Sequence, residues 1–247
     1  MNYRLKIQYD GTRYKGWQRQ KGTEMTIQGK LEKVLSVYAG RELEIQGAGR
    51  TDAGVHALEQ VANVHFSDEF APEPGALKGY LNEYLPEDIR VLSVERAGER
   101  FHSRLNARGK RYSYHIIKHD RDCVFQRKYA WKAENDLDID KMKKAAGYLL
   151  GSHDFQSFCS RASKKKSTVR TIHSIDIQET EDLIYLIYEG NGFLHNMVRI
   201  LTGTLVGTGS GKLSPEEIPE ILEKRERQYA GETAPARGLF LEKVYYD

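Results

Sequence analysis

Hydrophobic and polar positions alternate along the first segment of the chain, residues 2–9. Tyr3, Leu5 and Ile7 share one face at a period of two, which predicts a β-strand with one buried side. Over residues 26–38 the apolar positions change to a helical period and form one stripe, which predicts an amphipathic helix.

The same reading of the first hundred residues predicts the order β-α-β-β-α-β. A second helix is expected over residues 73–85 and ends before Pro86, because the residue preceding a proline disfavours the helical conformation. The strands are expected over residues 2–9, 43–46, 60–66 and 89–94.

A second series with the same order follows. Its strands are expected over residues 108–117, 170–179, 183–189 and 239–246, and its helices over residues 139–150 and 194–208. An additional helix over residues 214–225 begins with Ser-Pro-Glu-Glu, which suits a helix N-terminus.

Two such series predict an α+β protein with two ferredoxin-like halves, residues 1–104 and 105–247. We expect the eight strands to form one mixed, mostly antiparallel sheet. The helices are then expected on one face, with a central cleft between the halves.

Composition excludes several classes of protein. In 247 residues, of which 30% are charged, no apolar run approaches the roughly 20 residues of a membrane span. The N-terminus lacks the apolar region of a secretory signal. Two cysteines are too few for a disulfide framework, so we expect a cytoplasmic protein with reduced thiols.

The net charge of +3 conceals an uneven distribution. Residues 104–132 contain nine Lys and Arg against two Asp, with aromatic residues between them, and residues 161–170 contain five basic residues and no acid. Cations bind phosphate and flat rings stack on bases, so this pattern favours a nucleic-acid partner. The alternative is that these residues are solvated strand faces and loops.

A glycine-rich run at residues 47–54 is the most informative segment. Its three glycines allow tight backbone turns and surround Arg50 and Asp52. Neither a dinucleotide fingerprint nor a phosphate loop fits, because the third glycine of the former and the Gly-Lys-Ser/Thr of the latter are missing. An ordinary tight turn remains the alternative interpretation.

The run from Gly49 to His56, GRTDAGVH, resembles the signature of the tRNA pseudouridine synthase A family. Other segments resemble motifs of the same family, in the same order along nearly the whole chain. These are YDGTxYxGWQRQ from Tyr9, TIQxxLE from Thr26, FHxR from Phe101, KRYxY from Lys110, GFLxxMVR from Gly192 and APAxGL from Ala234. The segment FHSRLNA from Phe101 departs mildly from the family's commoner FHARFSA.

The resemblance implies an isomerase that converts uridine to pseudouridine at positions 38, 39 and 40 in the anticodon stem-loop of tRNA. It also implies a homodimer of subunits with two ferredoxin-like halves around an active-site cleft. The reaction is redox-neutral and requires no cofactor. The sequence offers no metal-binding pattern, so we expect neither a cofactor nor a metal.

Asp52 matches the family's catalytic aspartate. Attack by its carboxylate on the ribose or the base and removal of a ribose proton both remain open. Arg199 matches the active-site arginine and is expected to pair with Asp52, with a phosphate contact or a structural ion pair as the alternative. Tyr112 matches the tyrosine that stacks on the target base, although Tyr114 lies on the same face of the strand and a core role is the alternative. Arg50 is expected to fill the space of a flipped nucleotide or to hold its phosphate.

Other residues near these motifs have weaker assignments. His56 is expected to pack the loop rather than to act as a base, and Trp17 either stacks on RNA or is buried. The candidate tRNA contacts are Arg19, Lys110, Arg111, Lys164, Lys165, Lys166 and Arg170.

The main alternative to an enzyme is a non-catalytic RNA-binding protein on the same scaffold. Asp52 distinguishes the two, because a pure binder has no need of a carboxylate that repels phosphate inside a basic cleft. A nucleotide hydrolase would need metal carboxylates or a phosphate loop, and the sequence contains neither pattern.

Overall fold

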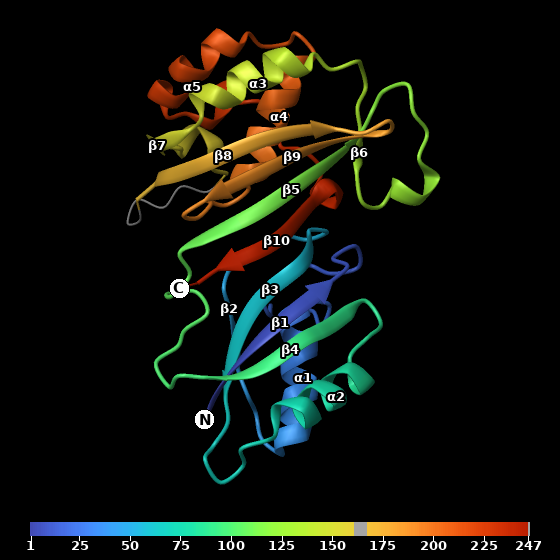
Figure 1. The fold of residues 1–247 in the computed structure, drawn as a ribbon, viewed down its shortest axis with the longest axis vertical. Helices are drawn as coiled ribbons and strands as arrows, with labels where there is room; N and C mark the ends of the chain where they lie inside the picture. The colour runs from blue at the N-terminus through green and yellow to red at the C-terminus, as the bar shows by residue number, and fades with distance from the viewer. Residues whose placement is uncertain (161–166, 247) are drawn as a thin grey trace. The chain divides into compact units, whose positions relative to one another are not determined.

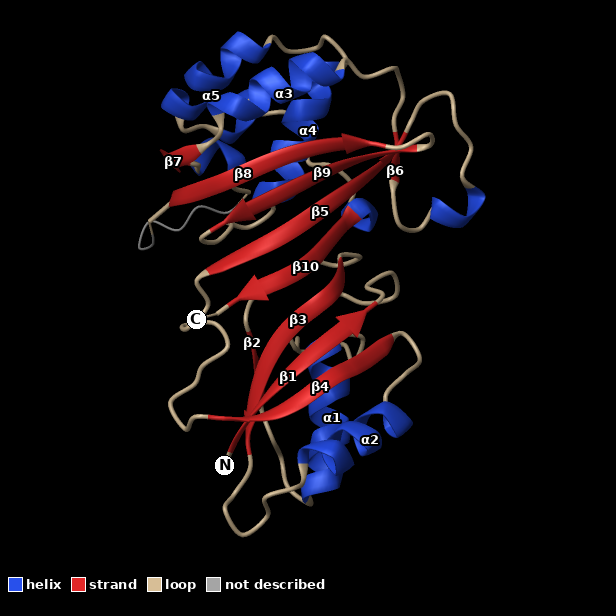
Figure 2. Cartoon of the chain, in the orientation of Figure 1, coloured by secondary structure: helices blue, strands red, loops and turns tan. Residues whose placement is uncertain are grey.

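The computed structural model describes residues 1–160 and 167–246 and confirms the α+β class. The described residues form five α-helices and ten strands (Figure 1 and Figure 2), and they divide into two compact units. Unit 1 comprises Met1–Arg108 and Phe240–Asp247, and unit 2 comprises Gly109–Leu239. Each unit is described by itself.

Unit 1 contains every element that the sequence predicts for the first hundred residues. Its sheet has the order β4-β1-β3-β10, with β1 antiparallel to both β3 and β4, β2 antiparallel to β3, and β10 parallel to β3. Figure 1 shows α1 and α2 together on one side of this sheet. The elements are β1 (Asn2–Tyr9), α1 (Ile27–Ala39), β2 (Ile45–Gly47), β3 (His56–His65), α2 (Pro74–Tyr84), β4 (Ile89–Ala97) and β10 (Leu239–Tyr245).

The alternating pattern of β1 provides one wall of the core of unit 1. Tyr3, Leu5 and Ile7 have no exposed surface, as a strand with one buried side requires. Helix α1 begins where the Thr26 hydroxyl accepts a hydrogen bond from the Gly29 N–H at 3.2 Å. It ends at Gly40, which adopts the left-handed conformation with φ of 64°.

Unit 2 has an antiparallel sheet in the order β5-β9-β8-β7, with β6 parallel to β5. Two of its strands, β6 and β7, are not expected from the sequence, so the expected count of eight strands is wrong for the described residues. They contain only two and four residues, too few to show a period of two. The elements are β5 (Gly109–Ile117), β6 (Trp131–Lys132), α3 (Ile139–Tyr148), β7 (Gly151–Asp154), β8 (Val169–Glu179), β9 (Leu183–Gly190), α4 (Met197–Gly209) and α5 (Ile218–Lys224).

Two helix boundaries in unit 2 differ from the expected ones. Helix α4 begins at Met197 rather than at 194, because Asn196 has a positive φ of 59° that interrupts the helical conformation. The segment expected as one helix over residues 214–225 begins as a 3₁₀ turn, Pro215–Glu217, and continues as α5. Ser214 and Glu217 form a capping box at its start, as the Ser-Pro-Glu-Glu pattern suggested.

Helix α4 is largely buried in unit 2, and a neighbouring loop crosses it at very short range. A methyl group on Gly203 would lie 1.9 Å from the carbonyl oxygen of Glu232, and one on Gly231 would lie 2.6 Å from Thr204 Cα. The Thr204 hydroxyl also accepts a hydrogen bond from the Gly231 N–H at 2.9 Å. Glycine at both positions therefore permits this backbone-to-backbone packing.

We predict that Gly203→Ala lowers the free energy of unfolding by about 1–3 kcal/mol or more, because the backbone of Glu232 must move. The matched control is Gly147→Ala in α3, where the added methyl group meets no atom within 4 Å. It should raise the free energy of unfolding by about 0.5–1 kcal/mol through helix propensity. Urea unfolding followed by circular dichroism measures both, and equal effects of the two substitutions would contradict the packing assignment.

Candidate active site

The loop at residues 48–55, called here the Asp52 loop, joins β2 to β3 and has a fixed backbone. The Gln60 side chain donates from Nε2 to the Gly49 carbonyl at 3.0 Å. Within the loop, the Val55 N–H donates to the Asp52 carbonyl at 3.1 Å. Val55 is buried whereas Asp52 is half-buried, so the turn exposes part of the aspartate while its anchors stay inside.

A second loop, the N-terminal loop at residues 10–26, is hydrogen-bonded to the backbone of the Asp52 loop. The Trp17 N–H donates to the Thr51 carbonyl at 3.0 Å, and the Gly54 N–H donates to the Tyr14 carbonyl at 3.3 Å. These two hydrogen bonds lie on either side of Asp52 in the sequence. They fix the backbone of the aspartate through its neighbours.

Two glycines of the N-terminal loop make this contact possible. Gly16 has a φ of +95°, and a methyl group there would lie 2.6 Å from the Thr51 carbonyl oxygen. A methyl group on Gly11 would lie 2.0 Å from the carbonyl oxygen of Val55. Any side chain at these positions would therefore separate the two loops.

Buried tyrosines support the two loops. The Tyr9 hydroxyl is 2.8 Å from the Thr51 hydroxyl, and burial raises the pKa of Tyr9 to about 12. The Tyr14 hydroxyl donates to Asp88 at 2.6 Å, and burial together with that carboxylate raises the pKa of Tyr14. Both phenols therefore stay protonated near neutral pH and serve as structural partners rather than as bases.

Two aromatic residues that the sequence left open have packing positions. His56 is buried and accepts a hydrogen bond at Nδ1 from the Gly11 N–H at 3.1 Å. Its ring stacks on that of Phe240, with ring centroids 4.6 Å apart. Trp17 is 2% exposed, and its ring covers Gly47 so closely that a methyl group there would lie 2.6 Å from it. Of the two alternatives for Trp17, the structure supports burial.

The sequence does not reveal which residues hold the Asp52 loop. Thr51 and Tyr9 have no assigned role in it, and the glycines of the N-terminal loop occur there only within the motif that begins at Tyr9. The available signal was Gly16 itself, because a glycine permits two backbones to approach closely.

Arg50 lies in the Asp52 loop and is exposed. Its neighbour Thr51 is 7% exposed, so the backbone that carries the guanidinium is held on its buried side while the side chain reaches solvent. Arg50 and Asp52 thus share one fixed loop of unit 1.

In unit 2, β5 carries two tyrosines on one face, and their surroundings differ. Tyr114 has no exposed surface, donates its hydroxyl to the Pro235 carbonyl at 2.7 Å, and has a pKa raised by burial. Tyr112 is 7% exposed and packs edge-to-face against Phe193, with ring centroids 5.3 Å apart. Tyr114 is therefore a core residue, which leaves Tyr112 as the better candidate for a ligand contact.

Arg199 lies in the first turn of α4, and its guanidinium is held in place by unit 2. Nε donates to the Ala234 carbonyl at 2.7 Å and Nη1 donates to the Asn196 side chain at 3.0 Å. Its own carbonyl accepts from the Ala234 N–H at 3.1 Å. Asp52 belongs to unit 1, so the pairing of Asp52 with Arg199 stays a prediction.

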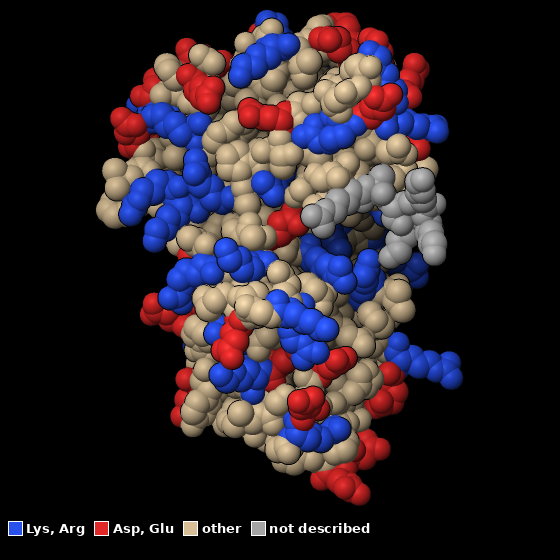
Figure 3. Space-filling model, turned by 180° about the vertical axis from the view of Figure 1, so that it is seen from behind, with Lys and Arg blue, Asp and Glu red and all other residues tan. Residues whose placement is uncertain are grey.

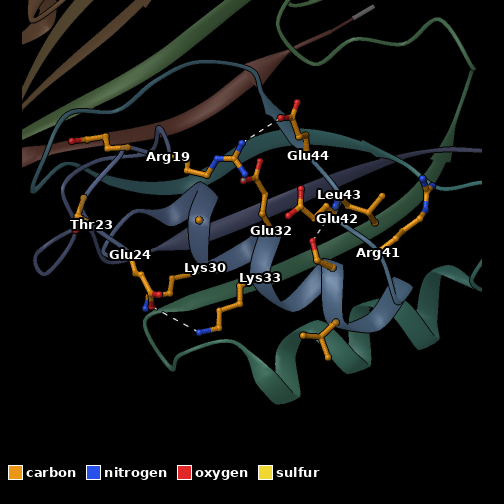
Figure 4. Close-up of a pocket in the computed structure, with 14 residues that line it drawn as sticks. Arg19, Thr23, Glu24, Lys30, Glu32, Lys33, Arg41, Glu42, Leu43 and Glu44 are labelled. Atoms are coloured by element: carbon orange, nitrogen blue, oxygen red, sulfur yellow. Dashed lines mark hydrogen bonds and ion pairs between the residues drawn. The ribbon is translucent and has the colours of Figure 1, made fainter.

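The candidate tRNA contacts have different surroundings. Arg19 forms ion pairs with Glu32 at 3.0 Å and Glu44 at 3.3 Å, and Figure 4 shows it pointing toward both carboxylates beside α1. Arg111 lies 3.2 Å from Glu189. Lys110 is half-buried on β5, Arg170 donates to the backbone of Ser167 and Val169, and Lys164, Lys165 and Lys166 lie outside the described residues.

The described part of the chain contains no group of three or more His, Cys, Asp or Glu that could hold a metal ion. Cys123 and Cys159 are both free thiols. No described helix has the length and apolar character needed to cross a membrane.

Comparison with known proteins identifies the class. A family model described as tRNA pseudouridine synthase matches residues 6–106 and 145–247. A tRNA pseudouridine synthase A from Bacillus sp. (strain KSM-64) is 51% identical over 245 residues, which cover 99% of each chain. A tRNA pseudouridine synthase A 2 from Bacillus anthracis is 48% identical and a tRNA pseudouridine synthase A from Thermoanaerobacter sp. (strain X514) is 43% identical, with the same coverage.

The chain therefore belongs to the tRNA pseudouridine synthase family, and it is an isomerase. The resemblance noted in the sequence is confirmed, and within the family the match extends along almost the entire chain of tRNA pseudouridine synthase A relatives.

We predict that Gly16→Ala lowers the rate of pseudouridine formation at saturating tRNA by at least about tenfold, because it displaces the backbone of Asp52. The matched control is Gly22→Ala in the same loop. Gly22 also has a positive φ, +84°, but an added methyl group meets no atom within 4 Å. Both substitutions carry similar backbone strain, so their difference in rate isolates the loop contact. Equal rates for the two variants would show that this contact does not position the aspartate.

Proposed function

We propose that this enzyme isomerises uridine to pseudouridine at positions 38, 39 and 40 in the anticodon stem-loop of tRNAs, with Asp52 as its catalytic residue. The observation that carries the proposal is the fixed Asp52 loop, whose backbone is hydrogen-bonded on both sides of the half-buried aspartate. Membership of the tRNA pseudouridine synthase family supplies the reaction class and the tRNA substrate.

The reaction breaks the N1–C1′ bond of the uridine, turns the uracil, and forms a C5–C1′ bond. The proton on C5 leaves to solvent, and N1 gains a proton. No electrons are transferred to another molecule. The enzyme must therefore expose the base, labilise one bond, and retain the free uracil while it turns.

An ionised carboxylate at Asp52 serves either route to bond cleavage. It attacks the ribose or the base as a nucleophile, or it removes a ribose proton. Both routes require the carboxylate to be held at a constant position relative to the sugar, because misplacement by about 1 Å costs orders of magnitude in rate. The grip of the N-terminal loop on the Asp52 loop supports this requirement.

The remaining roles follow from side-chain chemistry. The ring of Tyr112 stacks on the uracil and retains it after the bond breaks. The guanidinium of Arg199 pairs with Asp52 and keeps the carboxylate ionised. Arg50, exposed on the same loop as Asp52, enters the space of the flipped nucleotide or binds its phosphate.

The tRNA body would be held by cations, for which Lys110, Arg111 and Arg170 are candidates together with the lysines at 164–166. Arg19 is already paired with two carboxylates, so it would contribute least. We further propose a cytoplasmic homodimer that needs no cofactor, with the catalytic aspartate and the base-stacking tyrosine supplied by different halves of each chain, residues 1–104 and 105–247.

The decisive assay uses tRNA labelled with tritium at uridine C5, which isomerisation releases to water. Wild-type protein should release the label from the anticodon stem-loop. Asp52→Asn should bind the tRNA with unchanged affinity and release at least about 10³-fold less, because the ionised carboxylate is gone. Asp176→Asn, at an exposed position of β8, is the matched control and should behave as wild type.

Two results would contradict this assignment. Binding of tRNA without tritium release by the wild-type protein would favour the non-catalytic RNA-binding alternative. Normal release by Asp52→Asn would exclude Asp52 as the catalytic residue.

Tyr112 permits a sharper test of stacking. We predict that Tyr112→Phe retains most of the activity, because the ring and its edge-to-face contact with Phe193 survive. Tyr112→Leu removes the flat face and should lower kcat/KM by roughly 5- to 100-fold, the range of one lost base–aromatic stack. Steady-state tritium release measures both variants, and a larger loss for phenylalanine than for leucine would instead assign the function of Tyr112 to its hydroxyl.

A further inference from the structure

A projecting loop of unit 2 has no role in the chemistry described above. Residues 118–130, called here the arm, connect β5 to β6, and Figure 1 shows them standing away from the sheet and helices of this unit. The tip is a 3₁₀ turn, Val124–Gln126. The family model matches residues 6–106 and 145–247, so the arm lies outside the matched segments.

The base of the arm is anchored. Ile117, Ala130 and Leu183 form a buried apolar cluster against which Cys123 packs. The Ala130 carbonyl accepts a hydrogen bond from Arg237 Nε at 3.1 Å. The arm therefore leaves and rejoins the sheet at fixed points.

The tip is also ordered by hydrogen bonds of its own. The Gln126 N–H donates to the Cys123 carbonyl at 3.0 Å, and the Tyr129 N–H donates to the Gln126 carbonyl at 2.8 Å. Arg127 Nη1 donates to the Val124 carbonyl at 2.7 Å. These contacts define the conformation of a turn in which none of the side chains is buried.

This ordered turn presents apolar side chains to solvent. Phe125 is 90% exposed and Val124 is 65% exposed. A phenylalanine in this position gains nothing from folding, since its ring stays in water. Adjacent exposed apolar side chains on a fixed support are typical of a surface that contacts another molecule.

The charge around the tip indicates what kind of molecule this surface binds. Near the base of the arm, ion pairs join Lys118 to Glu179 at 3.0 Å and Lys132 to Asp122 at 2.7 Å. Arg121 pairs with three carboxylates, those of Asp120, Glu181 and Asp182, at 3.6–3.9 Å. Arg127 and Lys128, which follow the tip directly, are exposed. Figure 3 shows Lys and Arg side chains gathered around protruding uncharged atoms at its left edge, the side on which the arm lies when Figure 1 is turned by 180°.

We propose that the arm is a second RNA-binding site, separate from the catalytic loop. The ring of Phe125 stacks on an unpaired base, and Arg127 and Lys128 bind the phosphates beside that base. A flat ring flanked by cations matches single-stranded or looped RNA, in which bases are unstacked and phosphates are close to them. A second copy of the chain is the poorer fit, because a two-fold contact between tips would bring the cations of both copies together.

The arm begins at a distance along β5 from the tyrosine that is proposed to stack on the target base. Ile117, where the arm begins, is five residues beyond Tyr112 on the same strand, or about 17 Å at roughly 3.3 Å per residue. This step rests on the proposed function, in which Tyr112 stacks on the target base. The proposal places the RNA that the arm contacts outside the anticodon stem-loop, at unpaired bases elsewhere in the tRNA.

Filter binding with two RNAs tests the site: a full-length tRNA transcript and its isolated anticodon stem-loop. Phe125→Ser should raise the Kd for the full tRNA by about 5- to 100-fold and leave the Kd for the stem-loop unchanged. Phe125→Trp should retain tight binding, because it keeps a flat ring at this position. Val37→Ser, which removes an apolar side chain that is 69% exposed on α1, is the matched control and should change neither Kd.

A salt series tests the cations separately. Lys128→Gln should lower the slope of log Kd against log salt for the full tRNA by about 0.7–0.9, the value for one phosphate contact. The slope for the stem-loop should stay the same. An unchanged slope on both RNAs would remove Lys128 from the site.

Three outcomes would overturn the proposal. Phe125→Ser could leave the Kd for full tRNA unchanged, or it could raise the Kd for both RNAs equally. In sedimentation, the same substitution could convert a wild-type dimer to a monomer. The last would assign the arm to self-association. Tritium release from the stem-loop by the wild-type protein reports the proposed function independently, because the stem-loop lacks the RNA that the arm would contact.

Discussion

The candidate active site depends on one backbone contact, the approach of Gly16 to the carbonyl oxygen of Thr51. An added methyl group there would lie 2.6 Å from that oxygen, so the two loops touch at a distance that only glycine permits. The hydrogen bond from the Trp17 N–H to the same carbonyl keeps the loops together. The position of Asp52 therefore depends on a segment more than thirty residues earlier in the chain.

This arrangement separates the support of the aspartate from its chemistry. Hydrogen bonds to the backbone fix residues on both sides of Asp52, and buried phenols with raised pKa values support the loops. A carboxylate whose backbone is held in this way keeps one position relative to a bound substrate. Preorganisation of this kind costs nothing when the reaction occurs, because the loop is already ordered by folding.

The sequence predicted the elements well and the contacts between loops poorly. The strands of unit 1 show clear alternation, and the ends of α1 show ordinary capping residues, Thr26 and Gly40, so local chemistry determines them. β6 and β7 have two and four residues, and their pairing depends on neighbouring strands that a local pattern cannot reveal. Helix α4 begins after Asn196, because the positive φ of that residue is incompatible with a helix, and its sequence context does not predict this angle.

For the site, residue type alone left alternatives open. The glycine-rich run around Asp52 also fitted an ordinary tight turn, and the resemblance to the family's signature singled out the aspartate. Tyr112 and Tyr114 were indistinguishable by periodicity, and only the resemblance selected Tyr112. The physical difference between them depends on the hydrogen bond between the Tyr114 hydroxyl and the Pro235 carbonyl, which joins residues 121 positions apart. Phe125 lies among the aromatic residues of 104–132 that suggested base stacking, but the sequence does not distinguish an exposed ring from a buried one, and only the folded turn shows that this ring is exposed. Functional surfaces are thus least predictable where a side chain departs from the burial that its chemistry favours, because such a departure is a property of the folded chain.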